Sequence, residues 1–132
     1  MKGKISMLIK SKFNEYVNAE HAIAMKVSKN GNSYAVRVYT KTSDILGVYE
    51  DEKECNQTVT MLANYLGTYG PWIQAGEYLF KADAIESIFA GGKSVDVKIE
   101  NQVFSIACED EAKLEAILDK IEKGFCGAVF NM

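Results

Sequence analysis

The second half of the sequence repeats the pattern of the first. Residues 9–66 correspond to residues 72–125, and the segment 17–22 (VNAEHA) aligns with 80–85 (FKADAI). Each half continues with a turn-like cluster, an alternating run, a short apolar stretch and an acidic cluster that opens a helix-like segment. The offset between the halves falls from 63 to 61 to 59 residues along the chain, as expected where turns differ in length. A chain with this organisation is constrained to two similar units in tandem.

The size of the chain fits two half-domains that share a core. It has 132 residues, of which 48% are hydrophobic and 25% charged, so a disordered composition is excluded. We expect the first unit to span residues 1–68 and the second 69–132, joined in one compact body because a unit this small buries too little surface alone. No run of 18 apolar residues occurs, so we predict no membrane partner.

Alternation and β-branched or aromatic residues predict strands through most of each half. The predicted strands are at about 5–10, 14–18, 21–28, 33–40 and 44–49, then 72–80, 84–90, 94–100 and 102–108. Asn30-Gly31 predicts a type I′ hairpin, because both residues accept positive φ. Gly91-Gly92 is its counterpart, and Glu100-Asn101 forms a second tight turn. Turns this short leave no room for a crossover helix, so we expect an antiparallel meander in each half.

Each half should close with an amphipathic helix, over residues 51–66 and 110–124. Asp51 and Asp110 are the expected N-caps. Apolar residues recur on one face of each helix: Cys55, Val59, Leu62 and Leu66 in the first, and Leu114, Ile117, Leu118, Ile121 and Phe125 in the second. The predicted fold class is α+β, with two tandem repeats of an antiparallel meander plus C-terminal helix related by pseudo-twofold symmetry. The segment around Pro71 is the linker.

Few residues are suited to catalysis. His21 is the only histidine, which excludes metal sites with two or more imidazoles, and its repeat partner Ala84 favours a surface substitution. The acidic runs 50–52 and 109–111 lie at helix N-termini, where carboxylates satisfy free N–H groups. The segment 91–94 (GGKS) leads into a strand and predicts a hairpin turn, not a phosphate loop. We therefore expect no catalytic residue, metal or cofactor; an enzyme would need an active site made of carboxylates and tyrosines alone.

The three cysteines are Cys55, Cys108 and Cys126, an odd number without CxxC spacing. This pattern argues against a disulfide framework and a zinc ribbon, and it favours a reducing cytoplasm. Cys55 and Cys108 are expected to be buried. Whether Cys126 is reactive stays open, although nothing beside it in sequence lowers its pKa.

Charge is divided unevenly between the halves. Residues 1–68 hold eight Lys and one Arg against seven acids, a net +2, and residues 69–132 hold six Lys against eleven acids, a net −5. The basic residues that could bind a phosphate backbone as a row are Lys2, Lys4, Lys10, Lys12, Lys26, Lys29, Arg37 and Lys41. Acids of the same half nearly cancel them, and alternation leaves open whether Tyr34 or Tyr39 offers a stacking face. Nucleic-acid binding is therefore a disfavoured alternative.

Aromatic residues gather around the linker, at Tyr65, Tyr69, Trp72 and Tyr78. Trp and Tyr supply rigid contact area at interfaces, so Tyr69 and Trp72 are the candidate binding residues. The competing interpretation for Trp72, which aligns with Ile9, is that it fills the core.

The order of strand, V/F-N/K-A-E/D, hairpin, alternating strand and acidic helix start, with the turn 47–53 (GVYEDEK), resembles small uncharacterised proteins of low-GC Gram-positive bacteria, their phages and mobile elements. In those proteins a single copy is common. The resemblance covers nearly the whole chain twice, and it implies a fused dimer of such units.

Folding accounts for every strong pattern and leaves no convergent polar set. The sequence by itself therefore predicts a non-enzymatic cytoplasmic binding or protein-interaction module, with a protein partner and a monomeric or homodimeric state. The alternative, implied by the resemblance, is a phage or mobile-element inhibitor of a host defence system that acts on a CRISPR nuclease or sequesters a nucleotide signal.

Overall fold

The structure is a computed structural model that describes residues 8–10, 15–42, 44–49, 51–67, 70–125, 129 and 131–132. The first half contains β1 (Leu8–Lys10), β2 (Tyr16–Asn18), the 3₁₀ turn η1 (Ala19–His21), β3 (Ala24–Asn30), β4 (Ser33–Tyr39), β5 (Asp44–Tyr49) and α1 (Glu52–Leu66). The second half contains β6 (Trp72–Ala75), β7 (Tyr78–Lys81), η3 (Ala82–Ala84), β8 (Ser87–Gly91), β9 (Ser94–Ile99), β10 (Gln102–Ala107) and α2 (Glu111–Gly124). The α+β class is confirmed. The two halves have the same order of elements, although a duplication as their origin stays a prediction.

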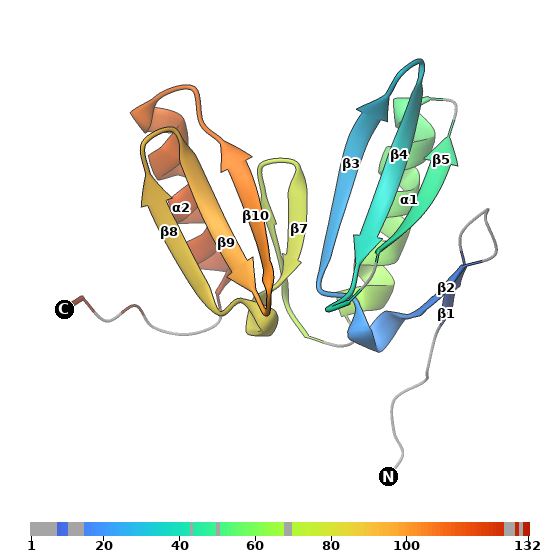
Figure 1. Cartoon of the computed structure of the whole chain (residues 1–132), viewed down its shortest axis with the longest axis horizontal. Helices are drawn as coiled ribbons and strands as arrows, with labels where there is room; N and C mark the ends of the chain where they lie inside the picture. The colour runs from blue at the N-terminus through green and yellow to red at the C-terminus, as the bar shows by residue number, and fades with distance from the viewer. Residues whose placement is uncertain are drawn as a thin grey trace, which may run out of the picture.

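All pairs among the described strands are antiparallel, and these strands form three sheets (Figure 1). The first sheet has the order β5-β4-β3-β7-β6, the second β10-β9-β8, and the third is the hairpin β1-β2. The meander therefore covers the last three strands of each half. The first two strands of each half form a separate hairpin, because a 3₁₀ turn redirects the chain before the next strand.

One strand of the second half joins the sheet of the first. β7 pairs with β3 in the register Ala24↔Phe80, Met25↔Leu79 and Lys26↔Tyr78. A twofold relation between the halves would also pair β2 with β8, and that pair is not formed. The strand pairing between the halves is thus one-sided, unlike the pseudo-twofold arrangement expected from the sequence.

In three of the hairpins the turn has two residues, and the first of them is a glycine at positive φ: Gly31 at 64°, Gly76 at 61° and Gly92 at 61°. Their second residues have no positive φ, which is typical of type II′ and not of the expected type I′ turn. Asn30 instead pairs with Ser33 as the last residue of β3, so that turn lies one residue later than predicted.

The predicted single strand over residues 72–80 is in fact the hairpin β6–β7. Gly76 turns the chain after Ala75, and Ala75 pairs with Tyr78. The hairpin lies between two buried clusters. Its residues Ile73, Ala75, Tyr78 and Phe80 belong to the cluster of the second half, while the opposite face packs against the cluster of the first.

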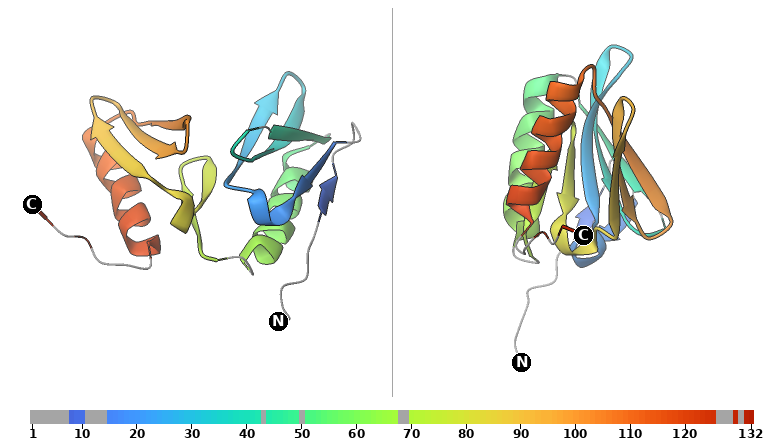
Figure 2. Two further views of the ribbon diagram at one scale, coloured as in Figure 1. Left: turned by 60° about the horizontal axis from the view of Figure 1, so that its bottom comes forward. Right: turned by 90° about the vertical axis from the view of Figure 1, so that its left-hand side faces the viewer.

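Both helices begin where the sequence predicts. The Asp51 carboxylate accepts a hydrogen bond from the Glu54 amide at 2.8 Å, and Asp110 accepts one from the Lys113 amide at 2.8 Å. The acidic residues thus act as caps. α1 and α2 lie on the same side of the molecule (Figure 2), and Cys55 and Cys108 are buried as predicted. Cys126 lies outside the described residues.

Candidate interaction site

β8 is an edge strand whose first four residues are all exposed. Ile88 is 37% exposed and Phe89 is 69% exposed. β3 is the corresponding strand of the first half. It is covered on the same side by β7, and its residues Ala24 and Met25 are fully buried. The two halves therefore differ in what lies beside this strand.

Two matching hydrogen bonds fix which residues correspond at the base of these strands. The Ile23 amide donates to the Tyr39 carbonyl at 2.9 Å, and the Glu86 amide donates to the Lys98 carbonyl at 2.9 Å. Counted from these bonds, Met25 corresponds to Ile88. The β3–β4 hairpin is longer than β8–β9, with seven residues in β3 and five in β8, which accounts for the falling offset between the halves.

The β1–β2 hairpin has the same place in the first half that β6–β7 has in the second. β2 and β7 both lead directly into a 3₁₀ turn, so Val17 corresponds to Phe80. Ile9 pairs with Val17, and Ile73 pairs with Phe80, so Ile9 corresponds to Ile73. This corrects the alignment of Ile9 with Trp72. The cause is the length of the connection, since seven residues separate Ile9 from its partner Val17 and six separate Ile73 from its partner Phe80.

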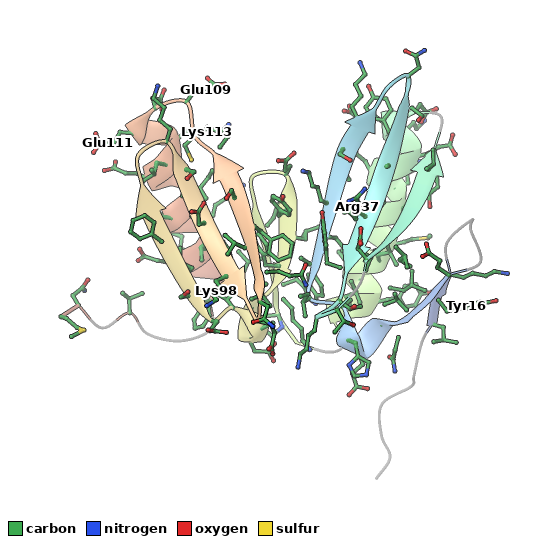
Figure 3. The ribbon with its side chains drawn as sticks, in the orientation of Figure 1. Tyr16, Arg37, Lys98, Glu109, Glu111 and Lys113 are labelled. Carbon is green, nitrogen blue, oxygen red and sulfur yellow. The ribbon has the colours of Figure 1, made fainter. Side chains whose placement is uncertain are left out.

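By the same register, Leu8 corresponds to Trp72 and Tyr16 to Leu79. Trp72 and Leu79 are partly buried against the first-half cluster. Leu8 is 64% exposed and Tyr16 is 56% exposed, and Figure 3 shows Tyr16 at the end of the molecule away from β8.

Only β2 and β8 lack a neighbour that their counterparts have. β5 and β10 are both sheet edges, and so are β1 and β6. By contrast, β7 and β3 pair with each other, while the outer edges of β2 and β8 are unpaired among the described strands. The candidate site is therefore the outer edge of β8 with Ile88 and Phe89, which we call the β8 edge.

The aromatic residues predicted for binding are placed differently from one another. Trp72 is half-buried, and its indole N–H is buried without a hydrogen-bond partner. Tyr65 is 56% exposed on α1, and Tyr78 is buried. Tyr69 lies outside the described residues, so its role, like that of Trp72, stays a prediction.

Four aromatic rings join the two halves. Tyr39 of β4 meets Phe104 of β10 edge-on, with ring centroids 5.0 Å apart. Phe104 also meets Tyr78 and Phe80, each at 5.6 Å. Burial raises the pKa of the Tyr39 phenol, and the nearby Tyr78 adds to the effect. Tyr39 is therefore engaged in this cluster and does not offer an open stacking face.

Three of the five cations of the predicted basic row that the structure describes lie beside carboxylates. Lys26 lies 3.7 Å from Glu77, and Arg37 lies 3.3 Å from Asp44. Lys41 lies 3.3 Å from Glu100 of the second half. Lys2, Lys4 and Lys12 lie outside the described residues. Within the described chain, these three ion pairs partly neutralise the row.

Residues of both 3₁₀ turns line a polar cavity of about 320 Å³. Its lining includes Glu20 and His21 from η1, Asp83 and Ala84 from η3, and Lys41. His21 and its repeat partner Ala84 thus line the same cavity. The residues that the structure describes contain no group of three or more His, Cys, Asp or Glu side chains arranged to hold a metal ion.

The described helices do not combine the length and apolar composition needed to cross a membrane.

The chain matches no protein-family model and no curated protein. Among solved structures it is similar to the LytTr DNA-binding domain of a protein described as a methyl-accepting/DNA response regulator from Bacillus cereus. The identity is 12%, the TM-score is 0.51, and the match covers 88% of this chain and 98% of that chain. At this identity, the similarity concerns the fold alone.

Proposed function

We propose that this chain is a non-enzymatic binding protein, and that a protein partner adds a strand to the β8 edge. The observation that carries the proposal is the exposure of Ile88 and Phe89 on a strand whose outer edge has no partner among the described strands. Natural proteins protect free edges with charged residues, proline or a covering element. The five residues of β8 (SIFAG) contain no charge and no proline. The β8 edge therefore has the properties of a surface that is covered when the protein is at work.

Strand addition explains how such a surface binds. Unpaired backbone N–H and C=O groups of an edge strand hydrogen-bond to an incoming extended segment, which supplies affinity. Alternate side chains then supply specificity, because successive residues face opposite sides of a sheet. Ile88 pairs with the buried Val97 and lies on the core side, while Phe89 pairs with Asp96 on the outer side. A partner strand would contact both.

DNA binding is the second candidate, because the similar solved structure is named as a DNA-binding domain. The ion pairs of Lys26, Arg37 and Lys41 weigh against it, since a phosphate backbone needs unpaired cations. An inhibitor of a host defence protein, as the family resemblance implies, is a special case of the first proposal with a defined partner.

Affinity capture with edge variants tests the proposal. The tagged chain, Ile88→Lys and Phe89→Glu are incubated with lysate of the source cells, with and without nuclease. Val103→Lys is the matched control, because Val103 is 59% exposed on β10 and lies away from the β8 edge. Circular dichroism checks that each variant is folded.

We expect a stoichiometric protein that survives nuclease, is lost with both β8 variants and is kept with Val103→Lys. Equal capture by the β8 variants and the unaltered chain would contradict the proposal. A nuclease-sensitive complex whose affinity falls steeply with salt would support the DNA-binding candidate instead.

A further inference from the structure

We propose that the strand added at the β8 edge is β2 of a second copy of this chain, so that copies join head to tail. This inference rests on the proposed use of the β8 edge for strand addition, and it names the partner.

The chain already contains the template for this contact. β7 pairs with β3, and the Lys81 amide donates to the Ile23 carbonyl at 2.9 Å. Leu79 and Trp72 pack on the first-half cluster, and Met25 is fully buried beneath them. The β6–β7 hairpin thus covers the outer edge of β3. The β1–β2 hairpin, its counterpart, is suited to cover the outer edge of β8 in the same way.

The correspondence between the halves gives the register of the new contact. β2 corresponds to β7, and β8 corresponds to β3. The pair Met25↔Leu79 therefore predicts Ile88 opposite Tyr16 of the second copy. The pair Ala24↔Phe80 likewise predicts Ser87 opposite Val17. The bond from Lys81 to Ile23 predicts that the Asn18 amide donates to the Glu86 carbonyl.

Exposed apolar side chains lie at both predicted contact surfaces. Leu8 and Tyr16 are the counterparts of Trp72 and Leu79, and they are 64% and 56% exposed. Ile88 is the counterpart of the buried Met25. Covering these side chains in the way the internal contact covers their counterparts would remove apolar surface from water at both ends.

The two surfaces lie at opposite ends of the long axis of the molecule (Figure 1). The contact uses different surfaces on the two copies, so it continues from copy to copy and ends in a ring or a filament. Charge favours the same orientation, because the half with β2 has a net charge of +2 and the half with β8 has −5.

Sedimentation velocity over a range of protein concentrations tests the inference, using the full chain, Ile88→Lys, Tyr16→Lys and the control Val103→Lys. We expect the full chain and Val103→Lys to form species larger than a monomer that grow with concentration. Each single variant should associate at least about tenfold more weakly than the full chain, because a charge is placed in the contact.

An equimolar mixture of Ile88→Lys and Tyr16→Lys separates this arrangement from other modes of association. The first variant keeps an intact β2 and the second keeps an intact β8, so the mixture should form a dimer that cannot grow. A mixture that stays monomeric although the full chain associates would overturn the head-to-tail contact. So would association that neither substitution weakens.

A full chain that stays monomeric at every concentration would also overturn the inference. If Ile88→Lys nevertheless loses a captured protein, the proposed function stands and only the identity of the partner is wrong. If capture is also insensitive to Ile88→Lys, both proposals fail.

Discussion

Met25 and Ile88 occupy matching positions in the two halves, yet Met25 is fully buried and Ile88 is 37% exposed. The difference comes from their neighbours. β7 lies beside β3 and covers Met25, whereas no described strand lies on the outer side of β8. Ile88 is thus exposed because the part of the chain that the structure describes has no further hairpin to cover β8 in the way that β6–β7 covers β3.

Replacing Gly76 tests the turn that separates β6 from β7. A Cβ at Gly76 would lie 2.7 Å from Ile106 Cγ2, while a Cβ at Gly92 meets no atom within 4 Å. Both glycines have positive φ, so each change to alanine costs about 1 kcal/mol from the backbone. We expect Gly76→Ala to lower the free energy of unfolding by about 2 kcal/mol more than Gly92→Ala, because of the added clash. Urea denaturation measures both, and equal losses would contradict this packing.

The helix caps should contribute independently. Asp51→Ala and Asp110→Ala each remove an acceptor for an amide at a helix N-terminus, and each should lower the free energy of unfolding by about 1 kcal/mol. The sites are on different helices, so the double variant should lose the sum. Lys53→Ala, in the first turn of α1, is the control. A loss from Lys53→Ala as large as that from Asp51→Ala would contradict the capping role.

Phe104 should be a main contributor to the contact between the halves. Its ring meets Tyr39 of the first half as well as Tyr78 and Phe80 of the second. Phe104→Ala should cost about 4 kcal/mol, from lost burial and the remaining cavity. Val103→Ala, at the adjacent exposed position, should change the free energy of unfolding by less than about 0.5 kcal/mol. Similar effects of the two changes in thermal and urea denaturation would contradict this assignment.

Tyr39 should make the protein less stable at alkaline pH. Burial raises the pKa of its phenol above the ordinary value of 10.0, so folding favours the protonated form. This contribution is fully present below pH 10 and is lost as the pH rises through the folded pKa. Urea denaturation of the native chain and Tyr39→Phe across this range measures the effect. The stability of Tyr39→Phe should fall less than that of the native chain, and parallel curves would contradict the assignment.

Local signals in the sequence were sufficient for much of the fold. Asp51 and Asp110 cap their own helices, so their roles follow from residues three positions apart. The hairpin at Gly76 was missed because an apolar run that alternates on both sides of one glycine also matches a single strand. The alignment of Trp72 with Ile9 failed for a related reason, since the two turns differ in length.

The candidate site depends on contacts that no local pattern encodes. β3 and β7 are separated by more than forty residues, and their pairing decides that Met25 is buried while Ile88 is not. Phe89 alone gave a signal, as an apolar residue on the outer side of an alternating strand. It gains meaning only once the neighbouring edge is known to be free.

Hydrogen exchange measured at two protein concentrations would detect head-to-tail pairing of β2 with β8 at the backbone itself. We expect amides of residues 15–18 and 86–89 to exchange more slowly at high concentration, because the outward-facing backbone groups of both strands then gain partners. Amides of β5 and β10, which are edges in both halves, should exchange at the same rate throughout. Exchange in β2 and β8 that does not depend on concentration would contradict head-to-tail pairing of this chain.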